Sequence, residues 1–562
     1  MDVSLKYLGQ SNFQQHGDSA TVSWAPNLAR DPVAFDAALK QPLRFREAMS
    51  ALHDVVISDL RHKPRDKSDY EAWKQQQRAR DAAAYQAARE VASQEILAKA
   101  GVDVPRDLVQ RHNKLVREYW SARMAYNRYL LAHNRDLWRL LMPCDPVITV
   151  ADDVVFFECF SADESSYGCL TVDREDGFSA SASTQNGTTN VDYSWDLYNQ
   201  FQGLRSYRET RCQVDPEGFD VKTTGQADYR EEKIDLPDGW LRGFMQIQGA
   251  MSLPMRKVSL SREAVYNVLT FLKRNKAKKS PRALRFELLP GKAPRLVLEP
   301  WEQVIESHGT VYDGPPTEPI RIWGRQRLLV LSRLLPLAEG FDVYLLGTGF
   351  PTFWVARLGE MRLTLGLSGW TQSDWTRAAA IDLLAPPASP TENQLDEIAT
   401  ILQKNGQLSL KHISLKSRTD DAVAAAALNH LANSGQVIRD LHDGVYRWRQ
   451  VMPRALGEAE LGPEHPELSG SRSLRMTVAS VVEVPRVGRL VSGSCQGTQT
   501  EMLLDGDGLI RRGKCGCTYY RKFGIKQGPC RHMLALRKDV LNPDPSGATA
   551  DMKSWFGKLS FN

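Results

Sequence analysis

The chain has 562 residues, of which 42% are hydrophobic and 25% charged, and its formal net charge is +5. At about 100–200 residues per domain, this length predicts three to five domains with enough apolar residues for several cores, which excludes a small scaffold that depends on disulfides. The mild basicity does not by itself indicate nucleic-acid binding. Eight cysteines in such a length also argue against a secreted, disulfide-rich protein.

The N-terminal segment Met1–Lys6 contains polar residues within its first few positions, and no apolar signal-peptide core follows it. No stretch of the sequence approaches the roughly 18–20 consecutive apolar residues that cross a bilayer. We therefore expect a cytoplasmic protein without membrane contact.

Residues 1–144 are expected to form a mostly helical region. Glu71–Lys99 is rich in good helix formers, and Gly101 and Pro105 suit the end of one helix and the start of the next. Apolar residues then recur at intervals of three and four, which places them on one helical face: Leu108, Leu115, Tyr119, Ala122, Tyr126, Tyr129, Leu137 and Leu140. The pattern predicts a long antiparallel helical hairpin within residues 45–142.

Residues 145–388 are expected to form a mixed, strand-rich α+β region. Val147–Phe160 is β-branched and aromatic, and short apolar stretches between turn-forming residues continue to about residue 250. Ser261 can cap a helix over Ser261–Asn275. Further strands are predicted at Ala283–Leu289, Pro294–Leu298, Asp342–Leu346, Thr352–Arg357 and Met361–Leu367, and further helices at Leu328–Ala338 and Ser373–Leu384. The proline-rich segment Ala385–Pro390 indicates a domain boundary.

Residues 389–452 show the pattern of three short helical elements followed by a hairpin. The predicted elements are Gln394–Asn405, Leu408–Lys416 and Asp420–Asn433, and then strands Val437–Asp440 and Val445–Trp448 around an Asp-Gly turn. This order resembles a winged helix-turn-helix, and a loop is expected over residues 453–472.

In a winged helix, the third helix reads DNA, but Asp420–Asn433 carries neither arginine nor lysine. Contact with a protein therefore suits this unit at least as well as contact with DNA. If the unit does bind nucleic acid, the side chains expected to reach a backbone from the wing are Arg418, Arg439, Arg447 and Arg449.

Three of the eight cysteines lie between Cys515 and Cys530, and His532 follows closely. The pattern is Cys-x-Cys, a 12-residue spacer and Cys-x-His. Gly516 lets the backbone turn between the first two thiols, and Pro529 suits the start of a short helix over Met533–Lys538. Four thiolate and imidazole ligands are typical of a closed, structural zinc site without room for a catalytic water. We therefore predict one structural Zn²⁺ bound by Cys515, Cys517, Cys530 and His532.

Two predicted strands, Val491–Ser494 and Glu501–Leu504, precede these ligands. Two strands, a Cys-x-Cys knuckle, a loop and Pro-Cys-x-His leading an apolar helix together resemble the SWIM-type zinc finger over about 50 residues. The resemblance implies a zinc-finger domain over residues 472–545, followed by a tail over 546–562. With the preceding regions, it describes a multidomain α+β protein.

Basic and aromatic residues surround the predicted ligands, and no Asp or Glu occurs from residue 509 to 538. Such residues suit phosphate contact and base stacking, but they also suit a solvated basic face with aromatic rings packed on the finger. The candidates for contact with nucleic acid or a protein partner are Arg511, Arg512, Lys514, Tyr519, Tyr520, Arg521, Lys522, Lys526 and Arg531.

The sequence contains neither a P-loop nor an HExxH motif, and we identify no catalytic residues. The first hypothesis is a non-enzymatic adaptor. Large bacterial SWIM proteins, which the chain resembles in layout, are associated with MoxR-type AAA+ ATPases and von Willebrand A proteins. The alternatives are a DNA- or RNA-binding protein in repair or regulation, and an enzyme whose site lies in residues 145–385.

Overall fold

The computed structural model describes residues 12–16, 19–24, 33–57, 146–161, 164–180, 183–190, 201–202, 204–207, 209–214, 238–277, 281–369, 386, 388, 390–451, 465–485, 487–505, 508–525 and 528–541, with Lys114, Tyr129 and His133. The chain divides into two compact units, residues 60–143 and the remainder. Most of the predicted helical hairpin lies outside the described residues. Among the described residues, no helix is both long and apolar enough to span a bilayer.

A five-stranded sheet near the N-terminus was not predicted. Its strands are β1 (Asn12–His16), β2 (Ser19–Trp24), β3 (Ala34–Leu39), β7 (Ser183–Gln185) and β9 (Glu209–Val214), in the order β1-β2-β9-β3-β7. The first three strands correct the expectation that residues 1–144 are mostly helical. Strands β2 and β3 pair with β9, and β3 also pairs with β7, far along the chain, so local sequence pattern did not reveal this sheet.

The largest sheet has eight strands, each antiparallel to its neighbours, in the order β10-β15-β16-β17-β6-β5-β4-β8. The strands are β4 (Val147–Val150), β5 (Val154–Phe160), β6 (Ser166–Asp173), β8 (Gly187–Asn190), β10 (Arg256–Leu260), β15 (Gly340–Leu345), β16 (Thr352–Arg357) and β17 (Met361–Leu367). The three strands predicted between residues 342 and 367 are confirmed. A turn divides the predicted run Val147–Phe160 into β4 and β5.

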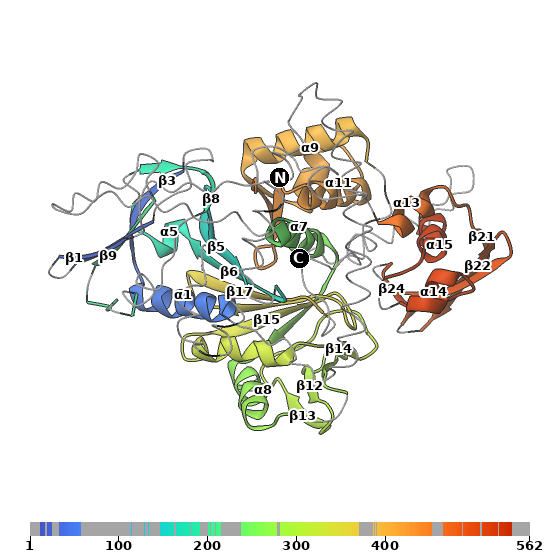
Figure 1. The fold of residues 1–562 in the computed structure, drawn as a ribbon, viewed down its shortest axis with the longest axis horizontal. Coiled ribbons are helices and arrows are strands. Elements are labelled where there is room, and N and C mark those ends of the chain that lie inside the picture. The colour runs from blue at the N-terminus through green and yellow to red at the C-terminus, as the bar shows by residue number, and fades with distance from the viewer. Residues whose placement is uncertain are drawn as a thin grey trace. The chain divides into compact units, whose positions relative to one another are not determined.

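Helices pack on both faces of this sheet (Figure 1). From α1 (Pro42–Val56), Phe45 contacts Phe157 with ring centroids 5.7 Å apart. From α7 (Asp238–Ser252), Phe244 contacts Phe160 at 4.8 Å. Because residues 157 and 160 point to opposite faces of a strand, β5 is buried at all its positions.

The helix α7 corrects the expectation of strands as far as residue 250. The glycines of this segment indicated turns, but two of the three in α7 permit close contacts, Gly243 with β5 and Gly249 with α11. A Cβ at Gly243 would lie 2.9 Å from the Phe160 ring, and one at Gly249 would lie 2.1 Å from Oδ1 of Asn433. Tertiary packing therefore outweighs the low helix propensity of glycine here.

A four-stranded antiparallel sheet follows, in the order β13-β12-β11-β14. It contains β11 (Leu284–Glu287), β12 (Arg295–Leu298), β13 (Gln303–Glu306) and β14 (Ile320–Ile322). The other described helices between residues 145 and 388 are α5 (Arg174–Gly177), α8 (Arg262–Arg274) and η1 (Arg325–Arg333). The predicted cap is confirmed, because the Ala264 N–H donates to Ser261 Oγ at 3.3 Å. The predicted helix Leu328–Ala338 is a 3₁₀ helix that begins and ends earlier, and Ser373–Leu384 lies outside the described residues.

Residues 391–448 form three helices and a three-stranded sheet in the order β18-β20-β19. The elements are α9 (Glu392–Asn405), β18 (Gln407–Ser409), α10 (Leu410–Ser417), α11 (Asp421–Asn433), β19 (Val437–Asp440) and β20 (Val445–Trp448). A capping box at Thr391 and Gln394 starts α9, and Gly406, with a positive φ of 70°, ends it. The predicted helices and hairpin strands are therefore present.

The hairpin arginines are buried, which overturns the expectation that they reach a nucleic-acid backbone. Arg439, Arg447 and Arg449 are 7%, 2% and 1% exposed. Arg449 forms an ion pair with Glu158 on β5, and Arg447 pairs with Asp153 at 2.6 Å. These side chains hold the three-helix unit against the large sheet.

The helix α11 is buried as well. Its alanines, Ala424–Ala427, are at most 6% exposed, and Asn429 Nδ2 donates to Gly249 O at 3.1 Å and to Ser252 Oγ at 2.6 Å. Helix α11 thus packs on α7 and does not present a reading surface.

The last part of the described chain is a four-stranded antiparallel sheet in chain order with three helices. Its elements are α13 (Pro466–Arg472), β21 (Thr477–Val484), β22 (Gly488–Cys495), β23 (Thr498–Leu504), β24 (Ile510–Cys515), α14 (Thr518–Phe523) and α15 (Arg531–Leu541). The two strands predicted upstream of the cysteines are confirmed as β22 and β23, with Ser492 opposite Glu501. Helix α13 lies where a loop was expected, because its seven residues are too few to show a helical period.

Candidate metal centre

The first two thiols lie where β24 ends. Cys515 is the last residue of the strand, opposite Thr500 of β23. The Gly516 N–H donates to Gln499 O at 3.0 Å, which keeps the knuckle against the sheet. Cys517 caps α14, and its Sγ accepts from the Tyr520 N–H at 3.4 Å. The Cys-Gly-Cys segment therefore turns the chain from strand to helix and directs both thiols to one side.

The other two side chains lie at the start of α15. Cys530 is fully buried and immediately precedes the helix, and its carbonyl accepts from the Leu534 N–H at 3.0 Å. His532 lies in the first turn. Pro529 and the predicted short helix are therefore placed as the sequence indicates, although the helix begins at Arg531.

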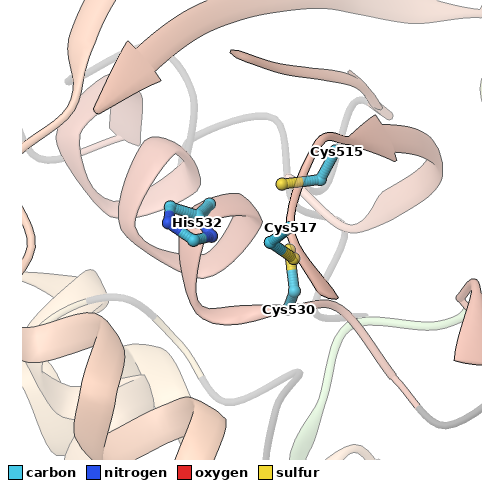
Figure 2. Close-up of side chains that lie close together, drawn as sticks. All are labelled: Cys515, Cys517, Cys530 and His532. Carbon is cyan, nitrogen blue, oxygen red and sulfur yellow. The ribbon is translucent and has the colours of Figure 1, made fainter. Parts of the chain in front are cut away.

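The four side chains converge between the end of β24 and the first turn of α15 (Figure 2). The three Sγ atoms and one imidazole nitrogen all lie within 4.8 Å of one another, and no second such cluster occurs in the described part of the chain. The Nδ1 atom of His532 is buried without a hydrogen-bond partner. Three thiols and an orphaned imidazole nitrogen form a donor set that fits one metal ion.

Hydrogen bonds within the cluster favour one thiolate. The hydrogen bond with Cys530 lowers the pKa of Cys515 to about 5, and Thr500 Oγ1, 3.3 Å from Cys515 Sγ, supports the same form. The same hydrogen bond, and then burial, raises the pKa of Cys530, and burial raises the pKa of Cys517. A metal that binds here therefore displaces protons from the latter two thiols.

Three apolar side chains of α15 lie beside the site on the helix side. Met533, Ala535 and Leu536 of α15 pack on Val491 and other core residues of the sheet. Cys495, outside the Cys-x-Cys pattern, packs beside this core and does not join the cluster. The finger core is small, so a bound metal would supply a large share of its stability.

Eight of the nine predicted contact residues are described by the structure, and they fall into two groups. In the first, side chains have partners within the protein: Arg511 pairs with Asp505 at 2.6 Å and donates to Leu346 O at 3.0 Å, and Tyr520 donates to Gly513 O at 2.5 Å. The Tyr519 ring packs on Phe523 with centroids 5.1 Å apart. These residues build the finger.

The second group is exposed: Arg512, Lys514, Arg521 and Lys522. Arg512 reaches Glu318 at 3.1 Å, and its side chain is 73% exposed. The Lys522 ammonium lies 5.0 Å from the Phe523 ring centroid. Lys526 lies outside the described residues. The surface available to a partner is thus smaller and less basic than the sequence suggested.

Arg531 belongs to the first group, although it was predicted to contact a partner. Its guanidinium pairs with Glu467 at 2.7 Å. Burial raises the pKa of Glu467, but the hydrogen bonds from Arg531 outweigh burial and hold that pKa below its ordinary value. Sequence reasoning missed both Glu467 and Thr500. Thr500 could have been found only by predicting the strand register that places it opposite Cys515. Glu467 could have been found only by predicting helix α13.

The comparisons with known proteins identify no family for this chain. No family model matches the sequence, and no curated protein matches it. The solved structures that are similar in part include a proliferating cellular nuclear antigen from Entamoeba histolytica (12% identity, 40% of this chain, 89% of that chain, TM-score 0.28) and a PCNA2–PCNA3 complex from Sulfolobus tokodaii (8%, 40%, 90%, 0.27). These TM-scores are too low to bear on fold or function.

Proposed function

We propose that Cys515, Cys517, Cys530 and His532 bind one structural Zn²⁺ within a SWIM-type finger. The convergence of three Sγ atoms and one imidazole nitrogen within 4.8 Å carries this proposal. Zinc suits the set because it accepts thiolate and imidazole ligands in a tetrahedron. Four protein ligands leave no position for a substrate, so the metal stabilises the finger and does not catalyse.

Elemental analysis of the purified full-length chain tests this metal site. About one zinc per chain is expected. A variant with both Cys515→Ser and Cys530→Ser should lose it, and Cys495→Ser is the matched control, because Cys495 packs on the same core outside the cluster. Zinc retained in full by the double variant would refute the assignment.

From this closed site we further propose a non-enzymatic adaptor whose finger contacts a protein partner. Strand β21 favours a protein. In the described part of the chain it pairs only with β22, and Thr477–Glu483 is exposed throughout. Val478, Val481 and Val482 are 40%, 47% and 52% exposed. An open, apolar edge strand is the kind of surface that accepts a strand from another protein.

Nucleic-acid binding is the second candidate, and the exposed cations Arg512, Lys514, Arg521 and Lys522 favour it. Two observations weigh against it. Helix α11, the reading helix of the resemblance to a winged helix, is buried, and Arg511 and Arg531 are occupied in ion pairs. The protein-contact proposal is therefore preferred.

Two surface variants distinguish the candidates. The first carries Val481→Glu and Val482→Glu on β21, and the second Lys514→Glu, Arg521→Glu and Lys522→Glu on the basic surface. Binding is measured to a purified MoxR-type AAA+ ATPase and von Willebrand A protein, the partners that the SWIM resemblance suggests, and to duplex DNA and RNA across a salt series. We expect protein binding that the β21 variant abolishes and the basic-surface variant retains. Nucleic-acid binding that weakens steeply with salt, and that only the basic-surface variant loses, would favour the alternative.

A further inference from the structure

One carboxylate holds the residue between two of the metal ligands. Arg531 separates Cys530 from His532. Its backbone N–H donates to Glu467 Oε2 at 2.7 Å, and its guanidinium donates to Oε1 through Nη2 at 2.7 Å and through Nε at 3.1 Å. The Glu467 side chain is 6% exposed and that of Arg531 is 41% exposed, so the carboxylate is shielded from water and the guanidinium only in part.

The local structure of α13 is arranged around this contact. Helix α13 packs beside α15 (Figure 1). Its start is fixed by His465, whose Nδ1 accepts from the Glu467 N–H at 3.1 Å. One turn later lies Gly470, where a Cβ would stand 3.0 Å from Cζ and Nη1 of Arg531. The missing side chain gives the guanidinium the space it occupies.

The backbone bond bears directly on the ligand geometry. The N–H of Arg531 is in the first turn of α15, where helix N–H groups have no helical acceptor. The Glu467 carboxylate satisfies it and fixes the peptide plane between Cys530 and Arg531. That plane sets the directions from which the Cys530 thiol and the His532 ring approach a common point. The guanidinium neutralises the carboxylate. This matters because a zinc ion with three thiolate ligands forms a complex of net negative charge, which an unpaired carboxylate would repel.

We infer that Glu467 is a positioning residue of the metal centre, and that the functional finger includes α13. The inference rests on the proposed zinc site. Outer residues that orient metal ligands typically change metal affinity by about 10–100-fold. Thr500 contacts a different ligand, with its Oγ1 3.3 Å from Cys515 Sγ.

The test uses the full-length protein with Glu467→Ala, Glu467→Gln and the control Glu318→Ala. Glu318 pairs with Arg512 of β24 and is not one of the cluster residues. Zinc affinity is measured by competition with a chelator, and ligand geometry by the visible absorption spectrum of the Co²⁺-substituted protein. We expect Glu467→Ala to lower zinc affinity about 10–100-fold and to change the Co²⁺ spectrum. Glu467→Gln keeps an oxygen acceptor for the Arg531 N–H, so it should restore most of the affinity, and Glu318→Ala should match the wild type.

Wild-type affinity and an unchanged Co²⁺ spectrum in Glu467→Ala would overturn the inference and leave the zinc site intact. Failure of the zinc site itself would appear separately, as a wild-type protein without zinc. If Glu467→Ala does not fold, Gly470→Ala displaces the guanidinium while the carboxylate stays. A lower zinc affinity in Gly470→Ala supports the inference, and wild-type affinity with an unchanged Co²⁺ spectrum in Gly470→Ala contradicts it.

Discussion

Replacing Arg449 with methionine should strongly destabilise the contact between the three-helix unit and the eight-stranded sheet. The Arg449 and Glu158 side chains are both 0% exposed and form an ion pair. Tyr167 Oη donates to the other carboxylate oxygen of Glu158 at 2.7 Å. The Arg449 guanidinium also lies 5.2 Å from the ring centroid of Phe244 on α7. The pair thus joins β5, β6, α7 and the segment after β20.

The expected magnitude follows from burial. Arg449→Met leaves the Glu158 carboxylate without its counter-charge in a fully buried position. Breaking a buried ion pair in this way costs about 3–5 kcal/mol of unfolding free energy. Replacing both partners, as in Arg449→Met with Glu158→Gln, removes the uncompensated charge. The double variant should therefore recover to within about 2 kcal/mol of the wild type.

Urea-induced unfolding followed by circular dichroism measures these differences. The control is Arg512→Met, because the Arg512–Glu318 pair is 73% and 39% exposed and should contribute less than about 1 kcal/mol. The reasoning fails if Arg449→Met is no less stable than Arg512→Met. It also fails if the double variant is as unstable as the single one, because the loss would then not come from an unpaired charge.

Three further predictions concern the metal, pH and packing. Cys517→Ser should abolish stoichiometric metal binding and expose the segment from Cys517 to Cys530 to protease, whereas equal metal content and protection would contradict the four-ligand assignment. Burial, and then the charge of Arg333, lower the pKa of His53 from 6.5 to about 4. As pH falls from 6.5 to 4, the unfolded chain therefore binds this proton before the folded chain does, and the free energy of unfolding decreases by up to about 3 kcal/mol. In urea titrations at pH 7 and pH 4.5, His53→Gln should show a smaller decrease in the free energy of unfolding than the wild type. Gly249→Ala places a Cβ 2.1 Å from Asn433 Oδ1, so thermal unfolding should show that the folded state loses about 1–3 kcal/mol of stability, and Asn433→Ala should partly restore it. An unchanged melting temperature would contradict this close packing of α7 and α11.

Several parts of the fold follow from local sequence. Ser261 and Thr391 cap helices because a hydroxyl before an amphipathic run satisfies a free N–H. The Asp-Gly turn after Leu441 sets the hairpin of β19 and β20. The four metal-site residues also follow from local sequence, because the glycine between two cysteines and the proline before Cys530 fix where the chain turns. The SWIM resemblance stays a prediction, since no comparison tests it.

Other features depend on partners distant in sequence, and local pattern could not supply them. Strands β2 and β3 pair with β9, and β3 also pairs with β7, so long-range pairing builds this sheet around the local β1–β2 hairpin. Helix α7 forms although its glycines disfavour it, because the close packing at Gly243 and Gly249 leaves no room for a side chain. A basic side chain looks the same in sequence whether it faces solvent or a buried carboxylate. The sequence therefore predicted that Arg449 lies in the wing, whereas the tertiary structure pairs it with Glu158. It also predicted that Arg531 contacts a partner, whereas the tertiary structure pairs it with Glu467. The sequence determined which residues can bind a metal, whereas the tertiary structure decided which charges remain free to meet a partner, because burial and pairing depend on the whole fold.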